Sequence, residues 1–93
     1  MKYDVSRRAE QALREIFAYT FLNFAEAQVD QYLASLDATF SLLAENPRMG
    51  RQWRGEFRRF PGRDYWIYYR ILSANVFITD IRSARLKPPD DEA

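Results

Sequence analysis

The sequence predicts an α+β domain in which an N-terminal helical hairpin packs on a small antiparallel sheet. Two changes along the chain indicate this class. Apolar residues recur every three or four positions between residues 9 and 43, and from residue 56 onward they alternate with a period of two. The change of period falls close to Pro47, where the balance of charge also changes sign. A chain of 93 residues has room for a single hydrophobic core.

The first elements that we expect are a short strand and a long helix. Tyr3 and Val5 share one face of an alternating run, and Ser6 follows as a helix N-cap because its hydroxyl can accept a hydrogen bond from a backbone N–H. Tyr19 and Phe21 lie off the apolar stripe of this helix. The residues of the stripe are Ala9, Leu13, Ile16, Phe17, Thr20 and Phe24.

A second helix follows after a tight connection near residues 23–25. Asn46 and Pro47 end it, because asparagine tolerates the left-handed cap conformation and proline disfavours helix in the residue before it. We therefore expect an antiparallel helical hairpin. The buried stripe of the second helix consists of Val29, Tyr32, Leu33, Leu36, Phe40 and Leu43.

The C-terminal half is expected to form a meander of three strands at residues 56–60, 65–72 and 76–82. Glycines 50 and 62 are assigned to turns. In the longest strand, alternate residues point to the helices, namely Tyr65, Ile67, Tyr69 and Ile71. The other face then carries Trp66 and Tyr68 beside Arg70. Unless another segment covers it, we expect this aromatic face to be exposed as a partner site.

Charge is divided between the two halves, although the net charge is only +1. Residues 1–47 carry four basic and seven acidic side chains, whereas residues 48–87 carry ten basic and three acidic ones. The C-terminal half is therefore expected to make any charged contacts. Residues 1–87 are assigned to one domain, and residues 88–93, which are rich in proline and acid, to an acidic flexible tail.

The composition excludes several classes of function. The chain has no cysteine and no histidine, which excludes a disulfide framework, a zinc finger, a cysteine nucleophile and an imidazole base. No cofactor and no metal are expected. No stretch of about 18 apolar residues is present, and the first residues lack the apolar core of a signal peptide. We therefore expect a cytoplasmic protein that does not enter a membrane.

Four short segments, in this order, carry a resemblance to a known family. Residues 9–20 read AxxxLxxIxxYT, residues 42–51 read LLAENPRMGR, residues 57–60 read FRRF and residues 67–70 read IYYR. Over about residues 2–85 the chain resembles the ParE toxins of the ParE/RelE superfamily. The resemblance implies a β-α-α-β-β-β fold, with a small antiparallel sheet packed by an N-terminal helical hairpin.

The resemblance also implies a function. It indicates the toxin of a type II toxin–antitoxin system of the plasmid-stabilisation type, neutralised by direct binding of a ParD-like antitoxin in a hetero-oligomeric complex. The implied target is DNA gyrase, held in its cleaved complex with DNA, so that the toxin is not itself an enzyme.

The alternative is a ribosome-dependent mRNA endoribonuclease of RelE type, because the two groups of toxins share a fold. The nucleases carry an arginine in a strand motif of the form Tyr-Arg-Leu-Val-Tyr, and the matching residues 65–69 read YWIYY, which places Trp66 at that position. Residues 83–93 also lack the tyrosine or histidine expected there. Arg82 as a phosphate ligand and Glu56 as a base are the remaining candidates for such chemistry.

The basic cluster around Trp53 fits two kinds of partner. Arginines pair with phosphates and aromatic rings stack on bases, which suits DNA or a bare nucleic-acid-binding module. Arginines also pair with an acidic antitoxin, and the alternative to either partner is a solvated basic surface. The cluster consists of Arg48, Arg51, Arg54, Arg58, Arg59 and Arg63. Within the resemblance, we assign to the antitoxin Tyr19, Phe21, Arg58, Arg59, Trp66, Tyr68 and Arg70. We assign to gyrase or DNA Arg48, Arg51, Trp53, Arg54, Arg82 and Arg85.

Overall fold

The computed structural model describes residues 2–23, 26–62, 65–73 and 75–83. The elements follow in the order β1 (Lys2–Val5), α1 (Arg7–Asn23), α2 (Glu26–Glu45), β2 (Arg51–Arg54), β3 (Phe57–Pro61), β4 (Tyr65–Leu72) and β5 (Asn75–Ser83). The sheet order is β1-β5-β4-β3-β2, with β1 parallel to β5 and the other pairs antiparallel. The predicted α+β class is confirmed, with β2 as a strand that the sequence analysis missed.

The N-cap of α1 ties the start of the helix to the sheet. The Ser6 hydroxyl accepts a hydrogen bond from the Ala9 N–H at 3.0 Å and donates one to the Thr79 carbonyl at 3.0 Å. The Glu10 N–H donates to the Ser6 carbonyl at 2.8 Å, which is the first hydrogen bond of the helix. The predicted cap is therefore confirmed, and it also fixes α1 against β5.

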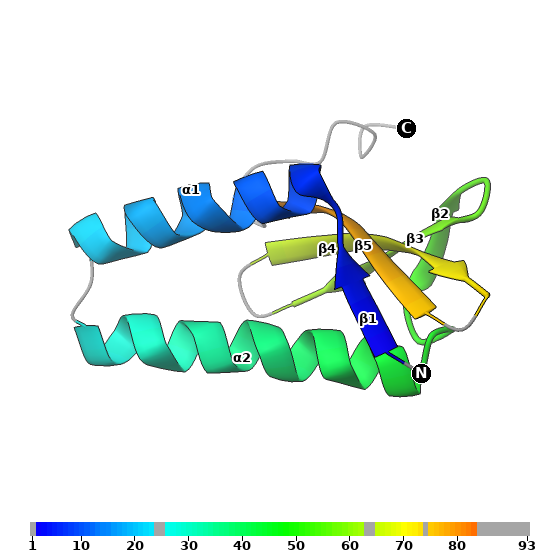
Figure 1. The fold of residues 1–93 in the computed structure, drawn as a ribbon, viewed down its shortest axis with the longest axis horizontal. Helices are drawn as coiled ribbons and strands as arrows, with labels where there is room; N and C mark the ends of the chain where they lie inside the picture. The colour runs from blue at the N-terminus through cyan, green and yellow to red at the C-terminus, as the bar shows by residue number, and fades with distance from the viewer. Residues whose placement is uncertain (1, 24–25, 63–64, 74, 84–93) are drawn as a thin grey trace.

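The two helices run antiparallel, and their joined ends project beyond the sheet (Figure 1). Helix α1 packs chiefly against β5 and α2 against β1, with fewer contacts between the helices themselves. Helix α2 ends where predicted, and the side-chain amide of Asn46 donates to the Leu42 carbonyl at 3.2 Å. Neither described helix is long and apolar enough to cross a membrane.

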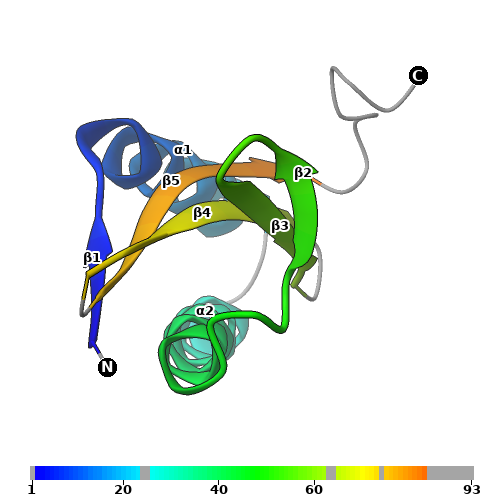
Figure 2. The ribbon, with the colours of Figure 1, turned by 90° about the vertical axis from the view of Figure 1, so that its right-hand side faces the viewer.

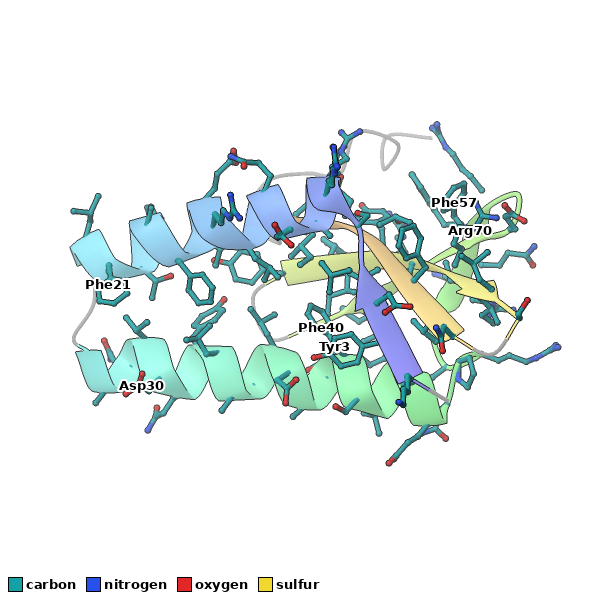
Figure 3. The ribbon with its side chains drawn as sticks, viewed as in Figure 1. Tyr3, Phe21, Asp30, Phe40, Phe57 and Arg70 are labelled. Carbon is teal, nitrogen blue, oxygen red and sulfur yellow. The ribbon has the colours of Figure 1, made fainter. Side chains whose placement is uncertain are left out.

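The core lies between the helices and one face of β4 and β5. Its buried members are Ala9, Phe40, Leu43, Ile67, Tyr69, Val76, Ile78 and Ile81. The predicted inward face of the longest strand is therefore confirmed. Tyr3 on β1 packs edge-on against Phe40 with 5.3 Å between ring centroids (Figure 3). Phe24, expected in the first stripe, lies outside the described residues.

A β-bulge in β5 changes which residues face the core. Tyr68 pairs with Asp80 but Tyr69 pairs with Ile78, so β5 has one extra residue at this point. Ile78 and Ile81 are both buried although they are three positions apart. Simple alternation along residues 76–82 does not predict this arrangement. The bulge leaves Asp80 and Arg82 on the face away from the helices, where the candidate site lies.

Candidate functional site

The turn between α2 and β2 is held by the hydroxyl of Tyr69. This hydroxyl donates a hydrogen bond to the Pro47 carbonyl at 2.7 Å and accepts one from the Gly50 N–H at 2.8 Å. Burial raises the pKa of Tyr69, and the Gly50 N–H and the nearby Arg58 charge oppose the rise. A Cβ at position 50 would overlap the hydroxyl, so Gly50 is required by close approach. The prediction that Gly50 lies in a turn is confirmed.

Arg58 fastens the same turn. Its guanidinium donates to the Gly50 carbonyl at 2.7 Å and to the Arg48 carbonyl at 3.4 Å. The side chain is partly buried. Arg58 was assigned to antitoxin binding, and that role stays a prediction, but these contacts give it a structural role as well.

Strand β2 forms a hairpin with β3 at the edge of the sheet opposite β1 (Figure 2). Gly55, with φ of 53°, adopts the left-handed conformation that a two-residue hairpin turn requires. The hairpin places Trp53 over the sheet, where its indole ring packs edge-on against the rings of Tyr68 and Phe57. The ring centroids are 4.8 Å apart for Tyr68 and 6.5 Å apart for Phe57. The missed strand therefore covers part of the face that was expected to be open.

The predicted exposure of the aromatic face is wrong for Tyr68, of which only 3% is exposed. The reason is the cover that Trp53 provides. Trp66 is partly buried, and the Arg59 guanidinium lies 4.8 Å from the centroid of its ring. The roles of Trp66, Tyr68 and Arg59 in antitoxin binding stay predictions.

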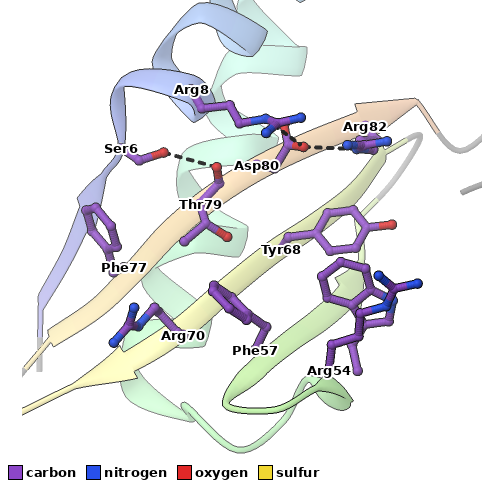
Figure 4. A pocket seen from close by; sticks show the side chains of 11 residues that line it. Ser6, Arg8, Arg54, Phe57, Tyr68, Arg70, Phe77, Thr79, Asp80 and Arg82 are labelled. Carbon is purple, nitrogen blue, oxygen red and sulfur yellow. Dashed lines mark hydrogen bonds and ion pairs between the residues drawn. The ribbon is translucent and has the colours of Figure 1, made fainter. Parts of the chain in front are cut away.

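A pocket of about 490 Å³ lies on this face of the sheet, between the β2–β3 hairpin and the start of α1 (Figure 4). Its walls are aromatic and its rim is basic. The aromatic lining residues are Trp53, Phe57, Tyr68 and Phe77, the basic ones are Arg8, Arg54, Arg70 and Arg82, and the remainder are Ser6, Thr79 and Asp80. Four guanidinium groups against one carboxylate give the pocket a positive potential.

Asp80 lies between two of these arginines (Figure 4). Its Oδ2 atom is 2.9 Å from Nε of Arg82 and 3.4 Å from Nε of Arg8, and its Oδ1 atom accepts the Ile81 N–H at 2.8 Å. The Asp80 side chain is 17% exposed and that of Arg82 is 36% exposed, so their ion pair is better shielded from solvent than a surface pair, whereas the Arg8 side chain is 72% exposed. The cluster shows that this part of the pocket accommodates a carboxylate between guanidinium groups.

Arg70 lines the other side of the pocket and already has an acidic partner. Its Nη2 atom is 2.8 Å from Oε1 of Glu56, and its guanidinium carbon lies 5.7 Å from the centroid of the Phe57 ring (Figure 3). The Arg70 side chain is 31% exposed. We expected Arg70 to pair with an antitoxin carboxylate, and this stays a prediction. An antitoxin carboxylate would have to compete with Glu56 for the Arg70 guanidinium.

The basic residues assigned to gyrase or DNA lie in two places. Arg48, Arg51 and Arg54 are exposed along the turn after α2 and the strand β2. Arg54 also contacts the Trp53 ring, with 5.1 Å between the guanidinium carbon and the ring centroid. Arg82 lies in the pocket. Arg85, and Arg63 of the basic cluster, lie outside the described residues.

Exposed apolar side chains gather near the end of α1. Tyr19 is 52% exposed, Phe21 is 64% exposed and Leu22 is 85% exposed. The first two were predicted to lie off the buried stripe, and this is confirmed. Their assignment to the antitoxin stays a prediction. Leu22 was not singled out by the sequence analysis, although it lies off the same stripe.

Comparisons with known proteins bear on this arrangement. Residues 3–87 match the family described as "ParE toxin of type II toxin-antitoxin system, parDE". The chain belongs to the ParE toxin family. It is 32% identical over 72 residues to Toxin ParE1 of Caulobacter vibrioides, which covers 74% of this chain and 75% of that protein. It is 30% identical over 73 residues to Toxin ParE1 of Mycobacterium tuberculosis, and the alignment covers 75% of this chain and 74% of that protein.

The fold of this ParE-family toxin is also found in a solved structure. The structure, described as the chromosomal ParDE TA system from P. aeruginosa, aligns with a TM-score of 0.76 over 89% of this chain and 95% of that one, at 15% identity. This likeness concerns the fold. The family match and the relatives identify the chain as the toxin of a ParDE type II toxin–antitoxin system.

The residues that remained as candidates for nuclease chemistry are engaged with other side chains in this ParE-family toxin. Glu56 is paired with Arg70 at 2.8 Å, and Arg82 is paired with Asp80 at 2.9 Å. Trp66, at the position of the nuclease arginine, packs under Arg59. A base and a phosphate ligand of an RNA-cleaving site would first have to leave these partners.

Sequence reasoning missed half of the pocket. Phe57 was not assigned to any site. Ser6 was assigned only to capping, and Arg8, Phe77, Thr79 and Asp80 were not assigned to any site. They come from the two ends of the described chain, and the parallel pairing of β1 with β5 brings them together. The two-residue turn at Gly55, flanked by Trp53 and Phe57, was the signal that would have revealed the missing strand.

Proposed function

We propose that this ParE-family toxin inhibits DNA gyrase in the cytoplasm by stabilising the cleaved gyrase–DNA complex, without breaking or forming a covalent bond itself. A ParD-like antitoxin neutralises it by direct binding in a hetero-oligomeric complex. Membership of the ParE toxin family over residues 3–87 carries this proposal. The ion pairs of Glu56 and Arg82 support the non-enzymatic part of it.

The surface proposed for gyrase or its DNA is the basic segment at the α2–β2 turn. Arg48 and Arg51 present exposed guanidinium groups there, suited to DNA phosphates or to carboxylates of gyrase. Trp53 is partly buried against Tyr68, so its role is to hold this segment in place. Arg54 and Arg82 extend the positive charge into the pocket, and Arg85 continues it along the sequence.

The test is a gyrase reaction on supercoiled plasmid, stopped with detergent so that trapped cleavage complexes appear as linear DNA. The double variant Arg48→Gln, Arg51→Gln is expected to need about tenfold more toxin for the same yield of linear DNA, because two charged contacts are lost. The matched control is Arg7→Gln, Arg14→Gln, which removes the same charge from the exposed side of α1.

Two results would contradict the proposal. If the parent toxin traps no linear plasmid, the gyrase target is wrong. If both double variants lose activity equally, net charge matters and the assignment of the α2–β2 turn is wrong. Added ParD-like antitoxin is expected to abolish the linear product at about equimolar concentration.

A further inference from the structure

A β-bulge brings two arginines of β2 to the same face of the sheet. The register of β2 against β3 shifts between Gln52 and Arg54, so β2 has one extra residue there. Arg51 pairs with Arg59, and Arg54 pairs with Phe57. Because these two partners are two positions apart in β3, they point to one face, and so do Arg51 and Arg54. The bulge therefore gathers two positive charges that simple alternation would place on opposite faces.

The charges of Arg48, Arg51 and Arg54, which we call the basic edge, are available to a partner molecule. The basic edge follows the turn from α2 into β2, at the border of the sheet (Figure 2). All three residues are exposed, and among the described residues no carboxylate forms an ion pair with them. Like charges on one surface repel one another, so a polyanion that neutralises them would be bound favourably. The arginines that already have acidic partners within the chain are Arg8, Arg14, Arg70 and Arg82.

Two side chains hold the backbone of the turn that carries the start of the basic edge. The Tyr69 hydroxyl joins the Pro47 carbonyl to the Gly50 N–H. The Arg58 guanidinium joins the carbonyls of Gly50 and Arg48, at 2.7 Å and 3.4 Å. A backbone that is fixed before binding loses less conformational entropy when the partner arrives. The turn is therefore preorganised to present its charges.

The composition of the basic edge suits a nucleic acid better than a protein. Three of the four residues of β2 are exposed, and these three, Arg51, Gln52 and Arg54, are all polar. Between residues 46 and 54, all of which the structure describes, Met49 is the one large apolar side chain that is exposed, at 40%. The centre of a protein–protein interface is depleted of charged residues, whereas protein–DNA interfaces are more polar and much more positively charged.

The aromatic residue of β2 is engaged in packing, which favours duplex DNA over a single strand. The Trp53 ring lies edge-on against Tyr68, with 4.8 Å between ring centroids. The Arg54 guanidinium carbon lies 5.1 Å from the centroid of the Trp53 ring. Proteins that bind single strands stack the bases on aromatic side chains. A duplex needs no such stacking surface, because guanidinium groups bind its phosphates directly.

We propose that the basic edge binds the phosphate backbone of duplex DNA without reading its sequence, and that it thereby holds the toxin on the DNA of the cleaved gyrase complex. This inference rests on the proposed action on gyrase. It assigns the surface to DNA phosphates instead of gyrase carboxylates. Contacts between arginine and phosphate fix position but carry no sequence information, so unrelated duplexes are expected to bind equally.

The first experiment titrates the purified toxin into a short fluorescent duplex and follows anisotropy between about 20 and 150 mM salt. Three phosphate contacts predict a slope of about −2.7 for log K against log salt. The double variant Arg48→Gln, Arg51→Gln is expected to bind about tenfold more weakly at the lowest salt and to have a slope of about −1. The matched control Arg7→Gln, Arg14→Gln removes the same charge from α1, and it should keep the parental slope and bind within about threefold of the parent.

Two outcomes of this titration would overturn the proposal. One is a parent toxin that does not bind the duplex at the lowest salt. The other is a control that loses as much of the slope as the double variant, because net charge alone would then explain binding. All four substituted arginines are exposed, so thermal melts of both variants are expected to match that of the parent.

Two competitors identify the anion. Unlabelled duplex of unrelated sequence is expected to displace the labelled duplex, whereas poly-glutamate at the same concentration of charge should be at least about tenfold less effective. Equal displacement by poly-glutamate would mean that the basic edge is a site for an acidic protein. Tighter binding of a single strand than of the duplex would mean that bases stack on the toxin. Either result would overturn the proposal.

The plasmid reaction with gyrase separates this inference from the proposed function. If the parent toxin traps linear plasmid but does not bind the duplex by itself, the DNA site is wrong and the gyrase target is retained. If the duplex binds through the basic edge but no plasmid is trapped, the gyrase target is wrong and the DNA site is retained.

Discussion

Two adjacent tyrosines in β4 offer a direct test of the packing described above. Tyr68 and Tyr69 are both buried and point to opposite faces of the sheet. The Tyr69 hydroxyl joins Pro47 and Gly50, whereas the Tyr68 hydroxyl has no partner in the described residues. Replacing each by phenylalanine makes the same chemical change in two opposite environments.

The structure sets the expected magnitudes. Tyr69→Phe leaves the buried Gly50 N–H without an acceptor, which costs about 1 to 3 kcal/mol, and it removes a second hydrogen bond to a carbonyl that is only partly buried. We expect a loss of about 2 to 3 kcal/mol in the free energy of unfolding. For a domain of this size that corresponds to a fall of about 8 to 24 °C in melting temperature. Tyr68→Phe removes an unpaired hydroxyl, so we expect no loss, or a gain of up to about 1 kcal/mol.

The assay is urea denaturation of both variants and the parent at pH 7, followed by circular dichroism, with thermal melts as a second readout. The slope of unfolding free energy against urea should be the same for all three proteins, so that differences in midpoint report stability. Equal destabilisation by the two changes would refute the account, because it would mean that the two hydroxyls are equally well paired.

Three further results are expected. Leu43→Ala should lower the free energy of unfolding by about 2 to 5 kcal/mol because Leu43 is fully buried. Leu42→Ala, at a residue that is 42% exposed, should lower it by less than about 0.5 kcal/mol. The urea midpoints of the two variants measure this difference, and equal losses would mean that the register of α2 is wrong. Gly50→Ala should lower the melting temperature further than removal of the tyrosine hydroxyl that it overlaps, and a parent-like melt would contradict the close approach. The hydrogen bond to Asp37 raises the pKa of Tyr3 to about 12. Unfolding measured as a function of pH should therefore show that the stability contributed by this hydrogen bond is fully present below pH 10 and is lost between pH 10 and 12. A Tyr3→Phe variant whose free energy of unfolding falls by the same amount over that range would contradict this cause.

The sequence predicted most of the fold because periodicity reports burial directly. The described residues of both helix stripes, the Ser6 cap and the inward face of β4 follow from local spacing, and they are confirmed. The strand β2 was missed because only one of its four residues, Trp53, is apolar, which gives too short a pattern to read. Its hairpin turn depends on Gly55 at positive φ, a cue that lies outside the strand itself.

The pocket was harder to predict, since it depends on tertiary contacts. Covering Tyr68 requires the missed hairpin, and placing Asp80 beside Arg82 on the open face requires the bulge in β5. The Arg8–Asp80 pair requires the parallel contact between the first and last strands. The bulge and the pairing of the first and last strands have no local signature, whereas the hairpin is marked locally only by its turn at Gly55. The Arg70–Glu56 ion pair likewise depends on β3 and β4 being neighbours. Arg70 and Arg82, both expected to face a partner, therefore contact acidic residues of their own chain.

The central claim is that this toxin acts on gyrase and not on messenger RNA. The most direct measurement places the purified protein in two parallel reactions, one with gyrase and supercoiled plasmid and one with translating ribosomes, and scores trapped linear plasmid and cut message at the same toxin concentrations. We predict linear plasmid in the first reaction and intact message in the second. Cut message with no trapped plasmid would contradict the account and would direct attention back to Glu56 and Arg82 as catalytic residues.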